Sequence, residues 1–204
     1  MQMLIAALNG SPQKEGNTAT LLQKALEIAG EQNVETKLIH VAEALKGIKV
    51  PFCYQCSTPC NGNCSRNNKL GEAFDVLRSA DAVIVGSPVY FGTVSGQLKA
   101  FWDKTRILRK EKVLLNVPGF AVSVGTSRFG GQETTMAALQ QMMLVQGMSI
   151  VGDGYNENDC GHFGVCAQQP VEKDVEVWKR MPIAVKRLLE VAEITMELKN
   201  SRKD

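Results

Sequence analysis

The sequence predicts an α/β protein, a three-layer sandwich in which helices cover both faces of a five-stranded parallel sheet. Three observations lead to this prediction. Short apolar runs alternate along the chain with segments of helical periodicity. Several of these runs are apolar throughout, as in strands buried on both faces. Most runs stop at a glycine or another turn-forming residue, which leaves a loop before the next helix.

Each element is assigned from its periodicity and from the residue that ends it. Residues 2–8 are mostly apolar and stop at Asn9-Gly10, so we predict a buried strand followed by a turn. Residues 18–28 carry apolar side chains every three or four positions, the spacing of a helix with one buried face. By the same criteria we predict strands at 34–41, 82–85, 120–124 and 148–151, and helices at 70–77, 95–107, 133–146 and 171–199.

One domain is predicted over residues 1–204, with a cysteine-rich insertion at about residues 50–68. The 204 residues, 44% of them hydrophobic, are enough for one sizeable core. A net charge of +2 argues against a nucleic-acid partner. No apolar run reaches the roughly eighteen residues of a membrane helix, and no signal peptide is expected. Pro182 should kink or divide the long C-terminal helix.

Cysteine spacing is the most informative feature of the composition. A secreted protein would spread its cysteines along the chain for disulfides, so a tight group predicts metal or iron–sulfur ligands in the reducing cytoplasm. Four thiolates are the usual ligands of a [4Fe–4S] cluster, while structural zinc and thiols that bind nothing are the alternatives. Cys160 and Cys166 are expected to be incidental thiols of a loop at 156–167 rather than redox-active groups. Within twelve residues lie Cys53, Cys56, Cys60 and Cys64.

Three loops are expected at the carboxyl edge of the sheet, where ligands of open parallel sheets bind. The first precedes a helix, and its amides, with the side chains of Ser11, Asn17 and Thr18, suit a single phosphate group. It lacks the lysine of a P-loop and the G-x-G-x-x-G of a dinucleotide site. An ordinary turn before a capped helix is the alternative interpretation of this loop.

The second and third loops complete the predicted site. Residues 87–93 offer Tyr90 and Phe91 as aromatic surface for a flat ring, and Gly92 permits close approach of the backbone. Residues 126–132 combine glycines with donors that suit a ring edge or a second substrate. Taken singly, each loop also fits simple packing or a flexible surface. Taken together, a phosphate loop and a ring loop at one edge predict a mononucleotide site, with FMN as its ligand.

These segments resemble known ones. NGSPQKEGNT resembles the phosphate loop of the NADPH-dependent FMN reductase family, whose fold is flavodoxin-like. GSPVYFGTVSGQLKAFWDKT resembles its isoalloxazine loop, and VGTSRFGGQETT is similar to its third loop. The resemblance runs from Met3 to about Val151. It implies FMN contacts at Ser11, Gln13, Gly16, Asn17, Thr18, Ser87, Pro88, Val89, Tyr90, Phe91, Gly92, Thr126 and Gly130.

Within this family, the four cysteines resemble those of the iron–sulfur flavoproteins. That resemblance implies FMN and a [4Fe–4S] cluster on each subunit, electron transfer between them, and assembly as a homodimer or homotetramer. Two departures from the family pattern stand out. Gln13 occupies a position that is usually arginine, with Lys14 beside it as a substitute counter-charge. The cysteine spacing is C-x₂-C-x₃-C-x₃-C rather than C-x₂-C-x₂-C followed by a longer gap.

The expected activity is that of a flavin-dependent oxidoreductase. NAD(P)H or reduced ferredoxin is the expected donor, and a quinone or an oxygen species is the expected acceptor. No side chain is assigned as a catalytic acid or base, because the chemistry belongs to the flavin. Arg128 is a candidate contact for a nicotinamide phosphate. The alternatives are an NAD(P)H-dependent FMN or quinone reductase without a cluster, a non-enzymatic electron carrier, and a zinc-stabilised binding module.

Overall fold

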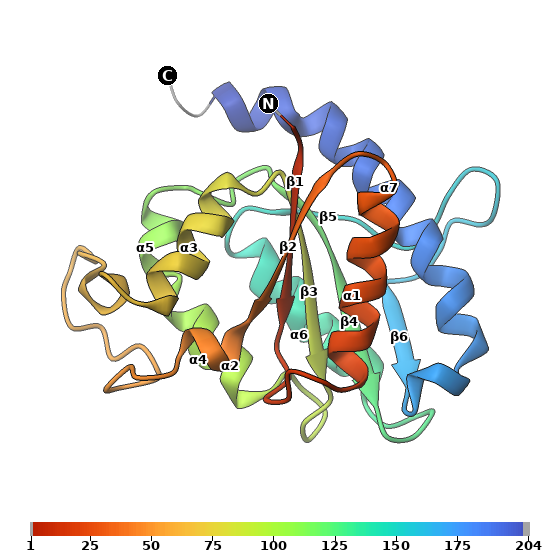
Figure 1. Cartoon of the computed structure of the whole chain (residues 1–204), viewed down its shortest axis with the longest axis horizontal. Coiled ribbons are helices and arrows are strands. Elements are labelled where there is room, and N and C mark those ends of the chain that lie inside the picture. The colour runs from red at the N-terminus through yellow and green to blue at the C-terminus, as the bar shows by residue number, and fades with distance from the viewer. Residues whose placement is uncertain (1, 202–204) are drawn as a thin grey trace.

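A parallel sheet between two helical layers forms the centre of the computed structural model, which describes residues 2–201 (Figure 1). Met1 and residues 202–204, which belong to the predicted domain 1–204, lie outside the described residues. The strand order is that of flavodoxin-like sheets, so the predicted fold class is confirmed. Along the sheet the strands follow the order β2 (Glu35–His40), β1 (Leu4–Asn9), β3 (Ala82–Pro88), β4 (Pro118–Gly125) and β5 (Ser149–Ile150).

The fifth strand position is divided between two short strands. β5 pairs with the first two residues of β4, and β6 (Val165–Gln168) pairs with the last four. Residues 151–164 leave the sheet between them. The predicted loop at 156–167 is therefore wrong at its end. With only two buried positions, β6 is too short for its alternation to distinguish it from a loop.

The two helical layers bury opposite sides of the strands. Ile5 and Ala7 of β1 face the layer of α1 (Asn17–Gly30) and α7 (Val175–Asn200), while Ala6 and Leu8 face the other layer. This alternation of adjacent side chains is the period of a strand buried on both faces. The second layer consists of α3 (Lys69–Ser79), α4 (Gly96–Lys104), α5 (Arg106–Lys110) and α6 (Gln132–Leu144), with the short α2 (Val41–Ala44) beside α3 and α4.

Two predicted helices differ from those observed. The helix expected at 95–107 ends at Lys104, because the Thr105 hydroxyl donates to the carbonyl of Trp102 at 2.6 Å where a new helix begins. The C-terminal helix begins at Val175 and runs past Pro182 without dividing. Its buried stripe, including Met181 and Val185, packs on the sheet. That packing outweighs the roughly 3 kcal/mol that an internal proline costs.

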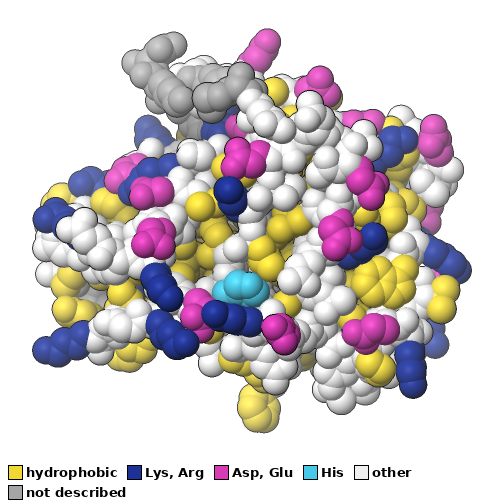
Figure 2. Space-filling view, viewed as in Figure 1, with side chains coloured by type: hydrophobic (Ala, Val, Ile, Leu, Met, Phe, Trp, Pro, Cys, Tyr) yellow, Lys and Arg dark blue, Asp and Glu magenta, His cyan; other side chains and the backbone are white. Residues whose placement is uncertain are grey.

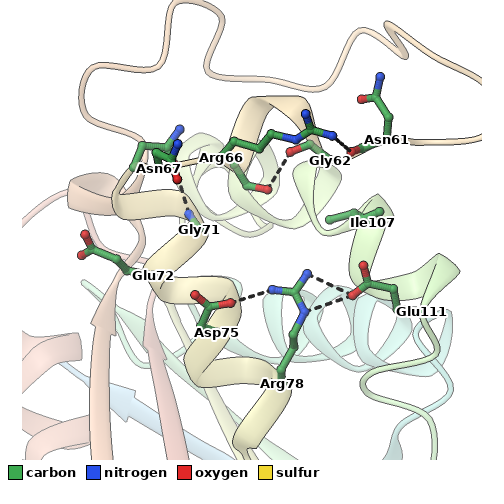
Figure 3. A pocket seen from close by; sticks show the side chains of 12 residues that line it. Asn61, Gly62, Arg66, Asn67, Gly71, Glu72, Asp75, Arg78, Ile107 and Glu111 are labelled. Atoms are coloured by element: carbon green, nitrogen blue, oxygen red, sulfur yellow. Dashed lines mark hydrogen bonds and ion pairs between the residues drawn. The ribbon is translucent and has the colours of Figure 1, made fainter.

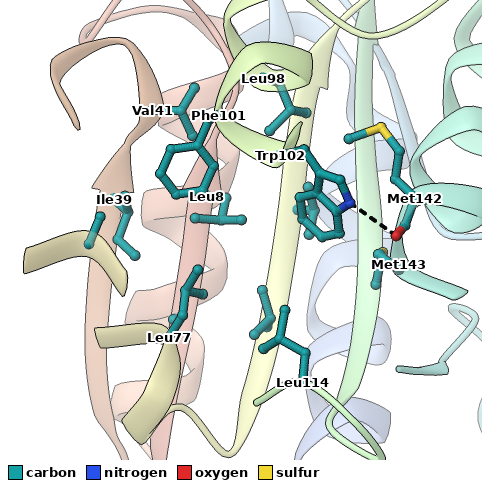
Figure 4. Packing of buried hydrophobic residues seen from close by; sticks show 14 of the residues in the cluster. Leu8, Ile39, Val41, Leu77, Leu98, Phe101, Trp102, Leu114, Met142 and Met143 are labelled. Carbon is teal, nitrogen blue, oxygen red and sulfur yellow. Dashed lines mark hydrogen bonds between the residues drawn. The ribbon is translucent and has the colours of Figure 1, made fainter. Parts of the chain in front are cut away.

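Aromatic side chains fix α4 against its neighbours. Phe101 meets Phe74 of α3 edge to face, with 5.7 Å between ring centroids. The indole of Trp102 donates to the carbonyl of Met142 in α6 at 3.1 Å (Figure 4). These contacts hold α4 and α6 rigidly beside the loops that precede them. None of the helices within residues 2–201 combines the length and the apolar character needed to cross a membrane.

Candidate functional site

The three predicted loops meet at the carboxyl edge of the sheet, the lower edge in Figure 1. The amide of Gly10 donates to the carbonyl of Gly86 at 2.8 Å, and the Ser95 hydroxyl donates to the carbonyl of Gly10 at 2.5 Å. The second and third loops also touch, because a Cβ on Gly131 would lie 3.1 Å from the Cα of Gly92. The chain therefore brings together the three segments that the sequence analysis selected.

Buried Asn9 determines the shape of the first loop. Its Oδ1 accepts from the amide of Ser11 at 3.0 Å, and its Nδ2 donates to the carbonyl of Gln13 at 3.1 Å. The same Nδ2 lies 3.0 Å from Nδ1 of His40, which therefore carries no proton and accepts. Burial, followed by the charge of Lys14, lowers the pKa of His40, in agreement with a neutral ring.

The N-terminus of α1 presents donors without partners. Gly16 provides no side-chain cap, and no described group accepts from the amides of Asn17 and Thr18. The Thr18 hydroxyl, on a residue only 3% exposed, is also without a partner among residues 2–201. Asn17 Oδ1 accepts instead from the amide of Val171 at 2.9 Å. These orphaned donors fit the phosphate of FMN, since a helix N-terminus favours an anion.

The positive charge beside this loop is already paired. Lys14 lies 3.1 Å from Glu43, which also binds Lys46 at 2.9 Å. Hydrogen bonds from Lys46 and then Lys14 lower the pKa of Glu43 to about 2. The Oε1 of Gln13 lies 2.9 Å from the place a Cβ on Gly16 would take, so the Gln13 side chain lies over that glycine. Lys14 therefore points to a carboxylate rather than toward the orphaned amides.

The second loop makes a tight reversal that exposes an aromatic side chain. Tyr90 and Thr93 exchange backbone hydrogen bonds of 2.9 and 3.1 Å, while Phe91 and Gly92 have positive φ angles of 50° and 77°. The Phe91 ring is fully exposed. Buried Ser87 supports the reversal, because its hydroxyl donates to the carbonyl of Pro88 and accepts from the amide of Ser95.

Gln132, whose role was not predicted from the sequence, shapes the third loop. Its Oε1 accepts from the amide of Gly130 at 2.9 Å, and its Nε2 donates to the carbonyl of Ser127 at 2.6 Å. Thr126 accepts from Gln169 at 3.0 Å, which joins the loop to the end of β6. A glutamine directly after two glycines at the start of a helix is the signal that was available in the sequence.

A cleft of about 990 Å³ opens beside the third loop. Cys166 of β6 lines it, and the buried Ser123 hydroxyl donates to its Sγ at 3.4 Å. Burial raises the pKa of Cys166, and the Ser123 hydrogen bond opposes that shift. The guanidinium of Arg128, which also lines the cleft, lies 5.6 Å from the ring centroid of Phe129. A molecule in this cleft would lie against the third loop.

The four clustered cysteines lie on the irregular segment that follows α2. Cys56 is exposed and the other three are half-buried. In the part of the chain described, no three cysteine, histidine or acidic side chains converge on a metal position. Burial raises the pKa of Cys64, the charge of Lys104 opposes this shift, and the charges of Cys60, Cys56 and Cys53 add to it.

Cations of α5 contact the segment at residues 53–64 that carries the four cysteines, which we call the cysteine loop. Arg106 donates to the carbonyl of Ser57 at 2.9 Å, and Lys110 donates to that of Cys60 at 3.2 Å. Gly62 packs on Ile107 (Figure 3). Both residues line a recess of about 360 Å³. Figure 2 shows Lys and Arg side chains, interspersed with Asp and Glu side chains, on this left-hand side of the molecule. Soft thiolate donors on a loop held by Arg106 and Lys110 suit an anionic iron–sulfur cluster.

Comparisons with known proteins identify the family and the fold of this chain. Residues 3–160 match the model of the family described as NADPH-dependent FMN reductase. An iron–sulfur flavoprotein of Methanocaldococcus jannaschii is 38% identical over 164 residues, 79% of this chain and 81% of that protein. One of Methanosarcina thermophila is 34% identical over 195 residues, 94% and 96% of the two chains. An apo NADH:FMN oxidoreductase structure shares the fold, with a TM-score of 0.70 and 22% identity over 92% of this chain and 88% of that one.

Proposed function

The chain belongs to the NADPH-dependent FMN reductase family and is a flavin-dependent oxidoreductase, and from this premise we propose that it works as an iron–sulfur flavoprotein. In this proposal FMN occupies the three-loop edge and a [4Fe–4S] cluster is held by Cys53, Cys56, Cys60 and Cys64. The observation that supports it best is the presence of four cysteines within twelve residues on a chain whose α1 N-terminus has orphaned phosphate donors. Names of relatives as iron–sulfur flavoproteins support the same proposal.

We assign the phosphate of FMN to the start of α1. The amides of Asn17 and Thr18 and the Thr18 hydroxyl donate to it, because no described group uses them. Ser11 and Gln13 are held in place around it by Asn9. The isoalloxazine ring lies on the second and third loops, where Phe91 and Gly92 leave their amides free. Further contacts in this proposal are Gly16, Ser87, Pro88, Val89, Tyr90, Thr126 and Gly130.

The protein contributes position rather than acid or base chemistry. Bound FMN would take up electrons in pairs and release them singly, and a bound cluster would carry one at a time. The buried side chains of Asn9, Ser87 and Gln132 orient the three loops through hydrogen bonds. The cleft beside the third loop admits a nicotinamide or a quinone, with Arg128 facing its phosphate or ring. The exposed cysteine loop is accessible to a carrier such as ferredoxin.

The cellular compartment and the oligomeric state of the protein are part of the same proposal. Reduced thiols and a cluster require a reducing compartment, so we place the protein in the cytoplasm. The rings of Phe129 and Phe91 are fully exposed. Both belong to loops at the carboxyl edge of the sheet where FMN is proposed to bind, which we call the flavin edge. Figure 2 shows a hydrophobic side chain projecting at this lower edge. Exposed aromatic side chains of this kind are typical of a subunit interface, which supports a homodimer or a homotetramer.

The first experiment is anaerobic purification followed by an absorption spectrum and analysis of FMN, iron, sulfide and zinc on one sample. We expect FMN with about four iron and four sulfide per chain, the stoichiometry of a Cys₄-bound cubane. Zinc in place of iron would contradict the cluster. Absence of flavin after reconstitution with FMN would contradict the three-loop site itself.

A second candidate is an NAD(P)H-dependent FMN or quinone reductase without a cluster. The observation that favours it is that the four thiols do not converge among the described residues. It predicts FMN without iron, and steady-state oxidation of NADPH with a quinone. Under either function, Arg128→Ala should weaken NADPH binding about tenfold, since it removes a charge-assisted contact. Unchanged affinities for both NADPH and FMN would exclude that role for Arg128.

A further inference from the structure

Lys104 is a buried cation without a counter-ion. It ends α4, its side chain belongs to a residue only 3% exposed, and no described group accepts a hydrogen bond from its ammonium. The half-buried Lys199, in contrast, has a carboxylate partner. Lys199 lies 2.6 Å from the carboxylate of Asp81 and also donates to two carbonyls. A cation on a residue this buried is poorly hydrated and is destabilising unless it is paired, so the environment of Lys104 lacks a negative charge.

The negative partner that Lys104 lacks is expected at the cysteine loop. The acids close to Lys104 in the sequence are engaged elsewhere, with Asp103 bound to Lys99 at 2.7 Å and Glu111 bound to Arg78 at 3.0 Å. Cys64 packs against the same apolar cluster as α4. Arg106, two residues after Lys104, donates to the carbonyl of Ser57 at 2.9 Å, and Ile107, three residues after it, packs on Gly62, so the end of α4 lies beside the cysteine loop. The cysteine loop is therefore the segment from which we expect a counter-ion for Lys104.

Lys104 differs from the other two cations of the loop. Arg106 and Lys110 donate to backbone carbonyls of the loop, the first contact being partly buried and the second open to solvent. They fix the path of the backbone and are screened by water. Lys104 makes no such bond, and its position at the C-terminus of α4 provides only a diffuse interaction with the helix dipole. In a site shielded from water, its charge acts at longer range.

We propose that Lys104 is the counter-ion of an anionic iron–sulfur cluster bound at the cysteine loop. This inference rests on the proposed function. Four thiolates outweigh the positive charge of an iron–sulfide core, so such a cluster is anionic and becomes more so on reduction. A nearby buried cation therefore favours both binding of the cluster and its reduced form. Lys104 is a positioning residue in this scheme and bonds no iron.

The proposal predicts effects of opposite sign in the empty and loaded protein. Lys104→Met keeps the apolar stem and removes the charge, so the cluster-free protein should melt about 2–4 °C higher. After reconstitution of the same chain with ferrous iron and sulfide, the variant should hold less iron per FMN. Its cluster should be about tenfold harder to reduce, which for a one-electron couple corresponds to a potential lower by about 59 mV.

Two further variants serve as controls. Lys99→Met makes the same change on the exposed side of α4 and should leave iron content and potential at wild-type values. Lys104→Arg keeps the charge and should retain most of the cluster. A merely structural Lys104 predicts instead that Lys104→Met lowers the melting temperature of the empty protein and leaves the cluster potential unchanged.

The wild-type and Lys104→Met measurements distinguish an error in the role of Lys104 from an error in the proposed cluster. If reconstituted wild-type protein binds no iron, the proposed cluster is wrong and so is this role for Lys104. If the wild type holds a cluster and Lys104→Met matches it in iron content and potential, only the role of Lys104 is wrong. A Lys104→Met protein that is stabilised when empty and deficient when loaded supports both.

Discussion

The flavin edge and the cysteine loop differ in how much of their geometry the fold supplies. At the flavin edge, buried side chains such as Asn9, Ser87 and Gln132 use their hydrogen bonds to shape three loops before any ligand is present. The cysteine loop is irregular, and its thiols do not converge among the described residues. Contacts from Arg106 and Lys110 hold only its backbone. The difference indicates that the sheet organises one site and that a bound metal would have to organise the other.

The largest effect that separates the two sites is expected from Cys60→Ser. Loss of one of four thiolate ligands should abolish iron binding, because a serine hydroxyl replaces a thiolate poorly at a soft metal centre. FMN affinity should stay at the wild-type value, since Cys60 lies outside the three loops. The measurement is iron and FMN content of the reconstituted variant. Ser57→Ala, a change beside the same cysteines, is the matched control and should retain its iron.

The next largest effect concerns the preformed edge. In Gly10→Ala, the new Cβ would lie 2.6 Å from the carbonyl of Gly86, so the first loop must move. We expect a loss of about 2–3 kcal/mol in the free energy of unfolding, measured in urea. Gly30→Ala is the control, because no atom lies within 4 Å of its Cβ, and it should be neutral or stabilise by about 0.5 kcal/mol. Equal effects of the two changes would contradict a rigid flavin edge.

Thr18→Val tests the phosphate contact within that edge. Removing a hydroxyl that donates to a charged phosphate should weaken FMN binding by about 1.5–3 kcal/mol, measured by fluorescence quenching during titration. Iron content should not change. The neighbouring Thr20 donates to the carbonyl of Gly16 at 3.2 Å, so Thr20→Val controls for loss of a hydroxyl on the same helix. If both variants bind FMN like the wild type, the phosphate lies elsewhere.

The smallest effect is expected from Glu43→Gln, which frees Lys14 beside the first loop. At pH 7 the freed lysine should tighten FMN binding about twofold, as a solvent-exposed charge does. The pKa of Glu43 is lowered to about 2, so its ion pairs are complete above the usual pKa of a glutamate and are lost as the pH falls toward 2. A small deficit in the melting temperature of the empty variant should therefore persist from pH 7 to about pH 5 and vanish near pH 2. A deficit independent of pH would exclude the ion pairs as its cause.

Local patterns in the sequence were sufficient for the sheet and for the place of the flavin edge. Apolar runs such as 82–85 lie within observed strands, because burial on both faces leaves a local signature. The predicted end of this strand at Gly86 is wrong, since β3 continues to Pro88. The three loops followed from the rule that parallel strands present their carboxyl ends together. The four cysteines were visible as a group for a similar reason, since their spacing lies within one short segment.

Contacts between distant residues decided the remainder. β6 became a strand because the end of β4 was available for pairing, and α7 continued past Pro182 because the sheet buried its apolar stripe. The same is true of charge, since neither the pairing of Lys14 with Glu43 nor the burial of Lys104 has a local pattern. The spacing of apolar residues in the sequence indicates which side chains are buried. The partner that each buried group finds depends on chain segments that only folding brings together.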